Sequence, residues 1–309
     1  MRLEHRILAV VALLAALSLP ATAASAENLT LGVFVPQAQF SSNAARSAYA
    51  ERLATRLSDA LGPETTVTAR AFARRADVLA FLRAKKVDLL LTDGLLAAGR
   101  KDTVLAHGLG GPAAALYASS GTSVVDLKGK TIAVAEVGSN DVRFYVNAAL
   151  SGEVAPKRYF GKIRLSKDSA AALAAVKANV ADGAFAPLGH PAAIGLSVVA
   201  KAGATPIAVL TLPRAERVSE SARTAILGAL STGAGLGGGI TGWRSGKGTG
   251  LSDAAASMSR RPRVLTTEPE LVRSAQKRLA APPIRLRPTG ALPAAKPGQQ
   301  NVVRPTLDD

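Results

Sequence analysis

The sequence predicts an α/β protein of two lobes, each built on a mainly parallel sheet flanked by helices. Segments with the pattern of buried strands alternate with amphipathic helical segments through the first hundred residues after the N-terminal stretch. A shorter copy of the same alternation follows between residues 131 and 186. The chain has 309 residues and 48% of them are apolar, a length and composition that suit two domain cores.

The first α/β unit is defined by β-branched or apolar strand segments and by helices whose apolar residues recur at helical spacing. We expect strands at 29–35, 65–70 and 87–91 and helices at about 44–61 and 76–84, with a further helix after Thr92, Asp93 and Gly94. The segment 87–91 is continuously apolar, as a parallel strand buried on both faces requires.

The second unit is smaller. We expect extended segments at 113–119, 131–137, 162–166 and 182–186, and helices from Asn140 to Leu150 and over 168–179. A return strand at 206–212 and a helix at about 219–230 then lead back. The glycine-rich residues 233–250 are expected to form a loop, and residues 270–279 a last helix. The tail 281–309 has no periodicity, which predicts disorder.

The first 26 residues have the layout of a cleavable export signal. Arg2 and Arg6 precede an apolar run from residue 7 to about residue 19, and Ala24-Ser25-Ala26 provides the small-residue cleavage site. The run is shorter than the roughly 20 residues of a membrane-spanning helix. We therefore expect cleavage after Ala26, a periplasmic protein and no membrane span afterwards.

Charge and composition narrow the function classes. The formal net charge is +16, which attracts anions but does not identify them, and a solvated basic surface explains it equally well. Aromatic residues make up only 4% of the chain, which argues against a stacking platform for single-stranded nucleic acid. The absence of cysteine excludes disulfides and thiol chemistry.

Three stretches resemble one known family. Residues 81–89 read as a helix, a basic turn and a V-D strand, residues 125–134 contain DLKGKTIAV, and residues 172–184 read as a helix followed by V-A-D-G-A. In this order they resemble the periplasmic substrate-binding proteins of ABC transporters, most closely the phosphonate/phosphate-type binding family. The resemblance spans about residues 29–232.

The resemblance implies a type II periplasmic-binding-protein fold. The first lobe would comprise residues 27–116 together with 205–280, and the second residues 117–204. A monomer would close about a hinge on a small anionic solute and present it to a transporter permease, without an enzymatic activity or a cofactor. The alternative is an envelope protein that keeps the lobes, has lost its small ligand, and binds a protein or polyanion through its basic surface.

Two triplets are the main candidates for the ligand site. Ser41, Ser42 and Asn43 follow the first strand and open a helix, and Gly138, Ser139 and Asn140 do the same in the second lobe. Helix N-termini offer unpaired N–H groups and a positive dipole end to an anion. Asp141 departs from the family pattern, because its carboxylate repels an anion unless it caps the helix.

Four further residues complete the candidate set. Thr92 and Asp93 end the third strand at the cleft, where Asp93 either accepts a ligand amine or caps the next helix. Tyr117 lies on an expected crossing segment, where it either contacts the ligand or packs the hinge. His190 follows the strand at 182–186, as a cleft residue or as a surface loop residue.

Other chemistry has no support in the sequence. Residues 233–238 satisfy G-x-G-x-x-G but follow a helical segment instead of a strand, which excludes the dinucleotide-binding arrangement. His107 and His190 belong to different expected lobes, so we expect no metal site. Neither a G-x-S-x-G elbow nor a cysteine nucleophile occurs, so no catalytic residue is proposed.

Overall fold

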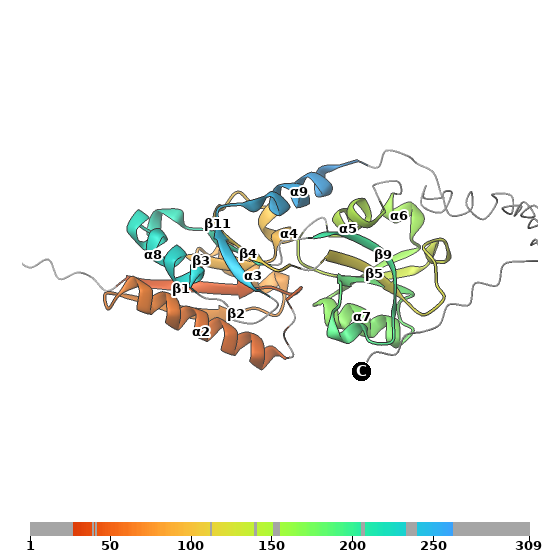
Figure 1. The fold of residues 1–309 in the computed structure, drawn as a ribbon, viewed down its shortest axis with the longest axis horizontal. Helices are drawn as coiled ribbons and strands as arrows, with labels where there is room; N and C mark the ends of the chain where they lie inside the picture. The colour runs from red at the N-terminus through yellow and green to blue at the C-terminus, as the bar shows by residue number, and fades with distance from the viewer. Residues whose placement is uncertain are drawn as a thin grey trace, which may run out of the picture.

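The computed structural model describes residues 27–38, 40, 42–111, 113–138, 141–150, 155–204, 208–232 and 240–261. These residues form two sheets that lie end to end along the long axis of the molecule, each flanked by helices (Figure 1). The predicted two-lobed α/β fold is confirmed. The expected signal peptide, the helix at 270–279 and the tail at 281–309 lie outside the described residues. None of the described helices has the length and hydropathy needed to cross a membrane.

The first lobe is a six-stranded sheet in the order β11-β4-β10-β3-β1-β2. Its strands are β1 (Glu27–Phe34), β2 (Thr65–Ala71), β3 (Leu89–Thr92), β4 (Thr103–Leu109), β10 (Val209–Leu212) and β11 (Gly242–Ser245). Its helices are α2 (Asn43–Leu61), α3 (Arg75–Arg83), α4 (Gly94–Ala98) and α8 (Glu220–Ser231). Leu31 and Val33 of β1 face the apolar side of α2, where Tyr49, Leu53 and Leu57 are fully buried.

The second lobe is a five-stranded sheet in the order β7-β6-β8-β5-β9. Its strands are β5 (Ala113–Ala118), β6 (Thr131–Ala135), β7 (Lys162–Ser166), β8 (Gly183–Pro187) and β9 (Ser197–Ala204). Its helices are α5 (Asp141–Ala149), α6 (Pro156–Tyr159) and α7 (Ser169–Lys177). Short 3-10 turns lie at Val125–Leu127, Pro191–Ala193 and, in the first lobe, Ala215–Arg217.

Both sheets are mixed, where the sequence predicted mainly parallel ones. β1 pairs in parallel with β2 and β3, and β6 with β7 and β8, but β5, β9, β10 and β11 form antiparallel pairs. The parallel strands β1, β3 and β6 end at the junction between the lobes. β5 and β10 each arrive from the other lobe and enter their sheets at this end. They therefore run antiparallel to the strands that end there.

Helix α9 (Gly248–Ser259) contacts both lobes and was not predicted. It packs on α4 in the first lobe and on α5 in the second, and Figure 1 shows it lying across the junction. The side-chain amide of Asn147 in α5 donates to the carbonyls of Ser257 at 2.6 Å and Arg260 at 3.0 Å. β11 and the start of α9 occupy residues that were expected to be a glycine-rich loop, and Trp243 of β11 is buried in the core.

Candidate functional site

The candidate site lies where the carboxyl ends of β1, β3 and β6 face one another across the junction. The backbone N–H of Ser169, at the start of α7, donates to the Pro36 carbonyl of the first lobe at 3.4 Å. Gly138 lies so close to α4 that a methyl group there would be 2.8 Å from the Leu95 carbonyl oxygen. These contacts bring the segment after β1 and the helix after β3 directly against the second lobe.

Asp93 is fully buried at the first-lobe side of this junction. Its Oδ2 accepts from the backbone N–H of Gln37 at 3.0 Å, and its side chain makes no capping bond to α4, although it occupies the capping position. Burial raises the pKa of Asp93 well above its ordinary value, against the lowering effects of the Gln37 N–H and of nearby Arg46. The carboxyl is therefore held by the β1 loop and retains one unused oxygen, Oδ1.

Asp141 occupies the corresponding place in the second lobe. Its carboxylate accepts from the backbone N–H groups of Val137 at 3.1 Å and Gly138 at 2.7 Å. Burial is the main cause that raises the pKa of Asp141 from 3.8 to about 6. The N–H of Gly138, which the sequence assigned to a bound anion, thus holds the chain's own carboxylate, together with the N–H of Val137.

Several polar atoms without a hydrogen-bond partner in the described part of the chain lie in or near these segments, and others, such as Arg214 Nε and Trp243 Nε1, lie elsewhere in the first lobe. The first group includes Arg46 Nε, Thr92 Oγ1, Asp93 Oδ1 and Ser169 Oγ, all of them buried. A buried polar atom without a partner costs about 1–3 kcal/mol, so such atoms need an explanation. A bound polar ligand that pairs with some of them is one such explanation.

Arg46 is the residue that the sequence interpretation missed. It is only 7% exposed, and no carboxylate of the described residues lies within ion-pair distance of its guanidinium group. It lies one turn into α2, on the stripe that continues through Tyr49, Ala50 and Leu53. A charged residue on the apolar stripe of a helix is the signal that could have identified it.

Two residues of the first predicted triplet, Ser42 and Asn43, form the N-terminus of α2. The Ser42 hydroxyl accepts from the backbone N–H of Ala45 at 3.1 Å and caps the helix, and Ser42 and Asn43 are exposed. The first turn of α2 contains no acidic residue, in contrast to α5, which begins with Asp141. Ser41, Ser139 and Asn140 lie outside the described residues.

Tyr117 and His190 lie together in the second lobe and make internal hydrogen bonds. The Tyr117 hydroxyl donates to the Pro187 carbonyl at 3.1 Å and accepts from the Gly189 N–H at 2.9 Å. His190 Nδ1 accepts from the Ala192 N–H at 3.1 Å, and burial lowers the pKa of His190. The structure thus places His190 in the turn after β8, and Tyr117 lies on β5 with its hydroxyl bonded to that turn.

No protein-family model matches the chain, and no curated protein matches it in sequence. Solved structures do share its fold. PhnD1 from Prochlorococcus marinus (MIT 9301), in complex with methylphosphonate, aligns with a TM-score of 0.57 and 13% identity, over 75% of this chain and 97% of that one. XAC2383 from Xanthomonas citri bound to ATP aligns with a TM-score of 0.55 and 14% identity, over 76% and 98%.

A third structure is the binding protein component of an ABC phosphonate transporter from Pseudomonas aeruginosa. It aligns with a TM-score of 0.54 and 14% identity, over 82% of this chain and 98% of that one. In each of the three alignments nearly the whole length of the solved chain is covered. The chain therefore has the two-lobed α/β fold of periplasmic binding proteins.

Proposed function

We propose that this chain is an exported solute-binding protein that holds a small anionic ligand between its two lobes for an ABC transporter. The observation that carries the proposal is the buried Arg46, which is near enough to Asp93 to affect its pKa, has an Nε without a hydrogen-bond partner, and forms no ion pair with a carboxylate among the described residues. Burying an unpaired cation is costly, and an anion in the junction compensates for it.

The geometry favours the first-lobe side of the junction for the anionic group. The α2 N-terminus has a neutral serine cap and no acidic residue in its first turn, so its positive dipole end is free of a competing charge. The starts of α5 and α7 carry the carboxylates of Asp141 and Asp168, which already accept backbone N–H bonds. The anionic group would therefore lie closer to Ser42 and Arg46 than to Gly138, and not midway between the two triplets that the sequence predicted.

Neighbouring groups fit an oxyanion as well. The unused hydroxyl of Ser169 is a short donor on the second-lobe side, next to the contact with Pro36. Because burial raises the pKa of Asp93, this carboxyl can carry a proton and donate to a ligand oxygen. In its ionised form the same carboxyl would accept a hydrogen bond from a ligand amine. A ligand that carries both an oxyanion and an amine therefore also fits.

The fold and the N-terminal segment support the rest of the proposal. The PhnD1 structure is described as a methylphosphonate complex, and the Pseudomonas aeruginosa structure as a phosphonate transporter component. The charged, apolar and small-residue layout of residues 1–26 supports export to the periplasm. The second candidate is an envelope interaction protein without a small ligand, which the net charge of +16 favours.

Titration calorimetry with methylphosphonate, phosphate, an alkylsulfonate and a small carboxylate tests the proposal. At least one should bind, and Arg46→Met should weaken it by about tenfold or more, since a hydrogen bond to a charged group is worth about 1.5–3 kcal/mol. Arg56→Met is the matched control, because Arg56 lies on the same helix but bonds to Ala229 and Thr232 of the first lobe. No binding by any ligand would favour the second candidate, and equal affinity in both variants would show that Arg46 does not hold the anion.

A further inference from the structure

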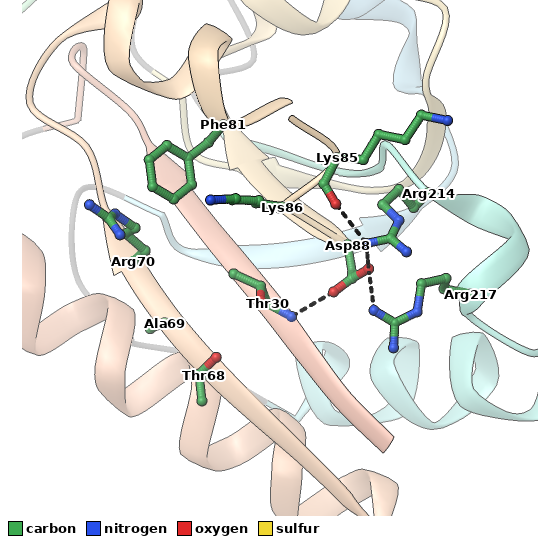
Figure 2. Close-up of a pocket in the computed structure, with 10 residues that line it drawn as sticks. All are labelled: Thr30, Thr68, Ala69, Arg70, Phe81, Lys85, Lys86, Asp88, Arg214 and Arg217. Carbon is green, nitrogen blue, oxygen red and sulfur yellow. Dashed lines mark hydrogen bonds and ion pairs between the residues drawn. The ribbon is translucent and has the colours of Figure 1, made fainter. Parts of the chain in front are cut away.

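A basic hollow of about 560 Å³ lies on the outer part of the first lobe, on the sheet face opposite α2 (Figure 2). We define the basic hollow by its charged residues Arg70, Lys85, Lys86, Asp88, Arg214 and Arg217. Thr30 and Thr68 form its floor on β1 and β2, and Figure 2 shows the basic side chains arranged around it. Five of the six charged residues are basic, and none of the six belongs to the lobe junction.

Asp88 positions two of the arginines. Its Oδ2 accepts from the Thr30 N–H at 2.8 Å, and its Oδ1 lies 3.3 Å from the Arg214 guanidinium group and 3.2 Å from that of Arg217. Arg214 also donates to the Lys85 carbonyl at 2.6 Å. One buried carboxylate therefore fixes two guanidinium groups at the rim, and each group also has a longer ion pair with a more exposed carboxylate, Arg214 with Glu216 at 4.0 Å and Arg217 with Glu27 at 3.7 Å.

The remaining basic residues have no such partner. The Arg70 guanidinium carbon lies 4.0 Å from the centre of the Phe81 ring, and the Lys86 ammonium nitrogen lies 5.8 Å from it. Among the described residues, no carboxylate is within ion-pair distance of Arg70, Lys85 or Lys86. Cation–π contact orients a charge without neutralising it, so the hollow keeps a strong positive potential.

The second lobe contains the same scaffold without these charges. Asp182 accepts from the Thr131 N–H at 2.8 Å, as Asp88 does from the Thr30 N–H. The hollow beside Asp182 has only Lys130 as a basic residue and also contains Asp126. The helix–turn–strand scaffold therefore does not require five basic residues.

The backbone conformation of Lys85 is a second, independent observation on this hollow. Its φ of 53° is in the left-handed region that disfavours a lysine, and Asn179 takes the same position in the second lobe with a φ of 55°. Asparagine and glycine adopt this conformation at lower cost, as they do at many helix ends. A lysine therefore stands where the backbone conformation favours another residue.

From these observations we infer that the basic hollow is a second binding site, separate from the lobe junction, for a group that carries several phosphates. The fixed guanidinium pair suits bidentate contact with phosphate oxygens, and the two lysines add mobile charges. The volume suits a small polyphosphorylated group, since ligand pockets commonly measure about 300–1,000 Å³. The inference does not depend on the proposed ligand of the junction.

Calorimetry with inorganic tripolyphosphate on the whole protein tests this site. The variant Lys85→Asn/Lys86→Ala places at position 85 an asparagine, which is the residue at the equivalent position of the second lobe, Asn179. The matched control Lys128→Ala/Lys130→Ala removes two exposed lysines of the second lobe, of which Lys130 lines the hollow beside Asp182. The first variant should bind about tenfold more weakly than wild type, a tenfold change being about 1.4 kcal/mol, and the control should bind within about twofold.

Flotation with vesicles of phosphatidylcholine and phosphatidylglycerol in equal parts identifies the source of the phosphates. Vesicle binding that the first variant alone loses would assign the site to lipid headgroups, and tripolyphosphate binding without vesicle binding would assign it to a soluble ligand. Either result supports the site. Equal affinity of the two variants for tripolyphosphate, or no binding to either probe, would overturn it. Arg46→Met should leave tripolyphosphate binding unchanged, which separates this test from that of the junction.

Discussion

The side-chain amide of Gln37, in the first lobe, donates a hydrogen bond to the Tyr145 hydroxyl in the second, and both side chains are buried. The Tyr145 ring stacks on Phe185 with ring centres 5.0 Å apart, so the bond links the β1 loop to the core of the second lobe. Arg75 and Glu136 form an ion pair across the same junction at 3.3 Å. The buried bond is the stronger link, since the ion pair is partly exposed to water.

Tyr145→Phe should lower the free energy of unfolding by about 1–3 kcal/mol, because it leaves the buried Gln37 amide without a partner and keeps the ring stack. Urea unfolding measures this change. Gln37→Leu/Tyr145→Phe should recover part of the loss, since neither polar group is then buried alone. Strictly additive losses in the double-mutant cycle would show that the two side chains do not interact.

The stability of the protein should depend on pH through Asp141. Its pKa is about 6 in the folded state against 3.8 ordinarily, so the folded state binds this proton more tightly than the unfolded state. The resulting stabilisation is complete below about pH 4 and is lost as the pH rises through about 6. Relative to Asp141→Asn, the wild type should lose about 3 kcal/mol between about pH 4 and pH 7.

Urea unfolding of the wild type and Asp141→Asn across this pH range measures the difference. Because other carboxylates titrate in both proteins, only the difference between the two curves reports Asp141. Parallel curves would mean that Asp141 has the same pKa in the folded and unfolded states.

Asp88→Ala and Asp182→Ala should differ in cost although the two carboxylates occupy equivalent places. Asp88→Ala leaves the Thr30 N–H and two guanidinium groups without their shared acceptor, which should cost about 3 kcal/mol. Asp182 is exposed and accepts from the Thr131 N–H, so its removal should cost about 1 kcal/mol. Chemical denaturation compares them, and equal losses would refute the positioning role of Asp88.

Lys85→Gly should stabilise the fold by up to about 1 kcal/mol, because glycine adopts a positive φ without steric cost. Asn179→Gly is the control and should change stability by less, since asparagine tolerates the same conformation. Thermal unfolding of both variants checks the comparison. A loss of stability in Lys85→Gly would show that the lysine side chain itself supports the turn.

The sequence patterns predicted correctly the parts of the fold in which strands and helices alternate and their apolar residues are regularly spaced. The apolar spacing of Tyr49, Leu53 and Leu57 predicted α2, and Gly62 ended it as expected. β11 and α9 were missed because glycine dominates the residues around them, and local propensity then predicts a loop. Their structure depends on distant partners, since Trp243 of β11 pairs with Gly108 of β4 and α9 rests on α4 and α5.

The sequence predicted where the candidate site lies better than it predicted which chemical groups form it. Strand ends followed by helices located the junction, and Asp141 was recognised as a possible helix-capping residue. The pairing of Asp93 with the Gln37 N–H could not be predicted, because it joins residues that are 56 positions apart. Arg46 escaped notice because its importance comes from burial, which depends on tertiary contacts such as that with Phe40, whose ring centre lies 6.0 Å from its guanidinium carbon.

Helix α9 has a mechanical consequence for the two lobes. Two chain passages, between β4 and β5 and between β9 and β10, leave one body free to swing and to twist against the other. Helix α9, held by Asn147, is a third attachment between the lobes. Any relative movement of the lobes would have to preserve or break its contacts with α4 and α5, so substitutions on the α9 face that meets α5 should change how readily the lobes move.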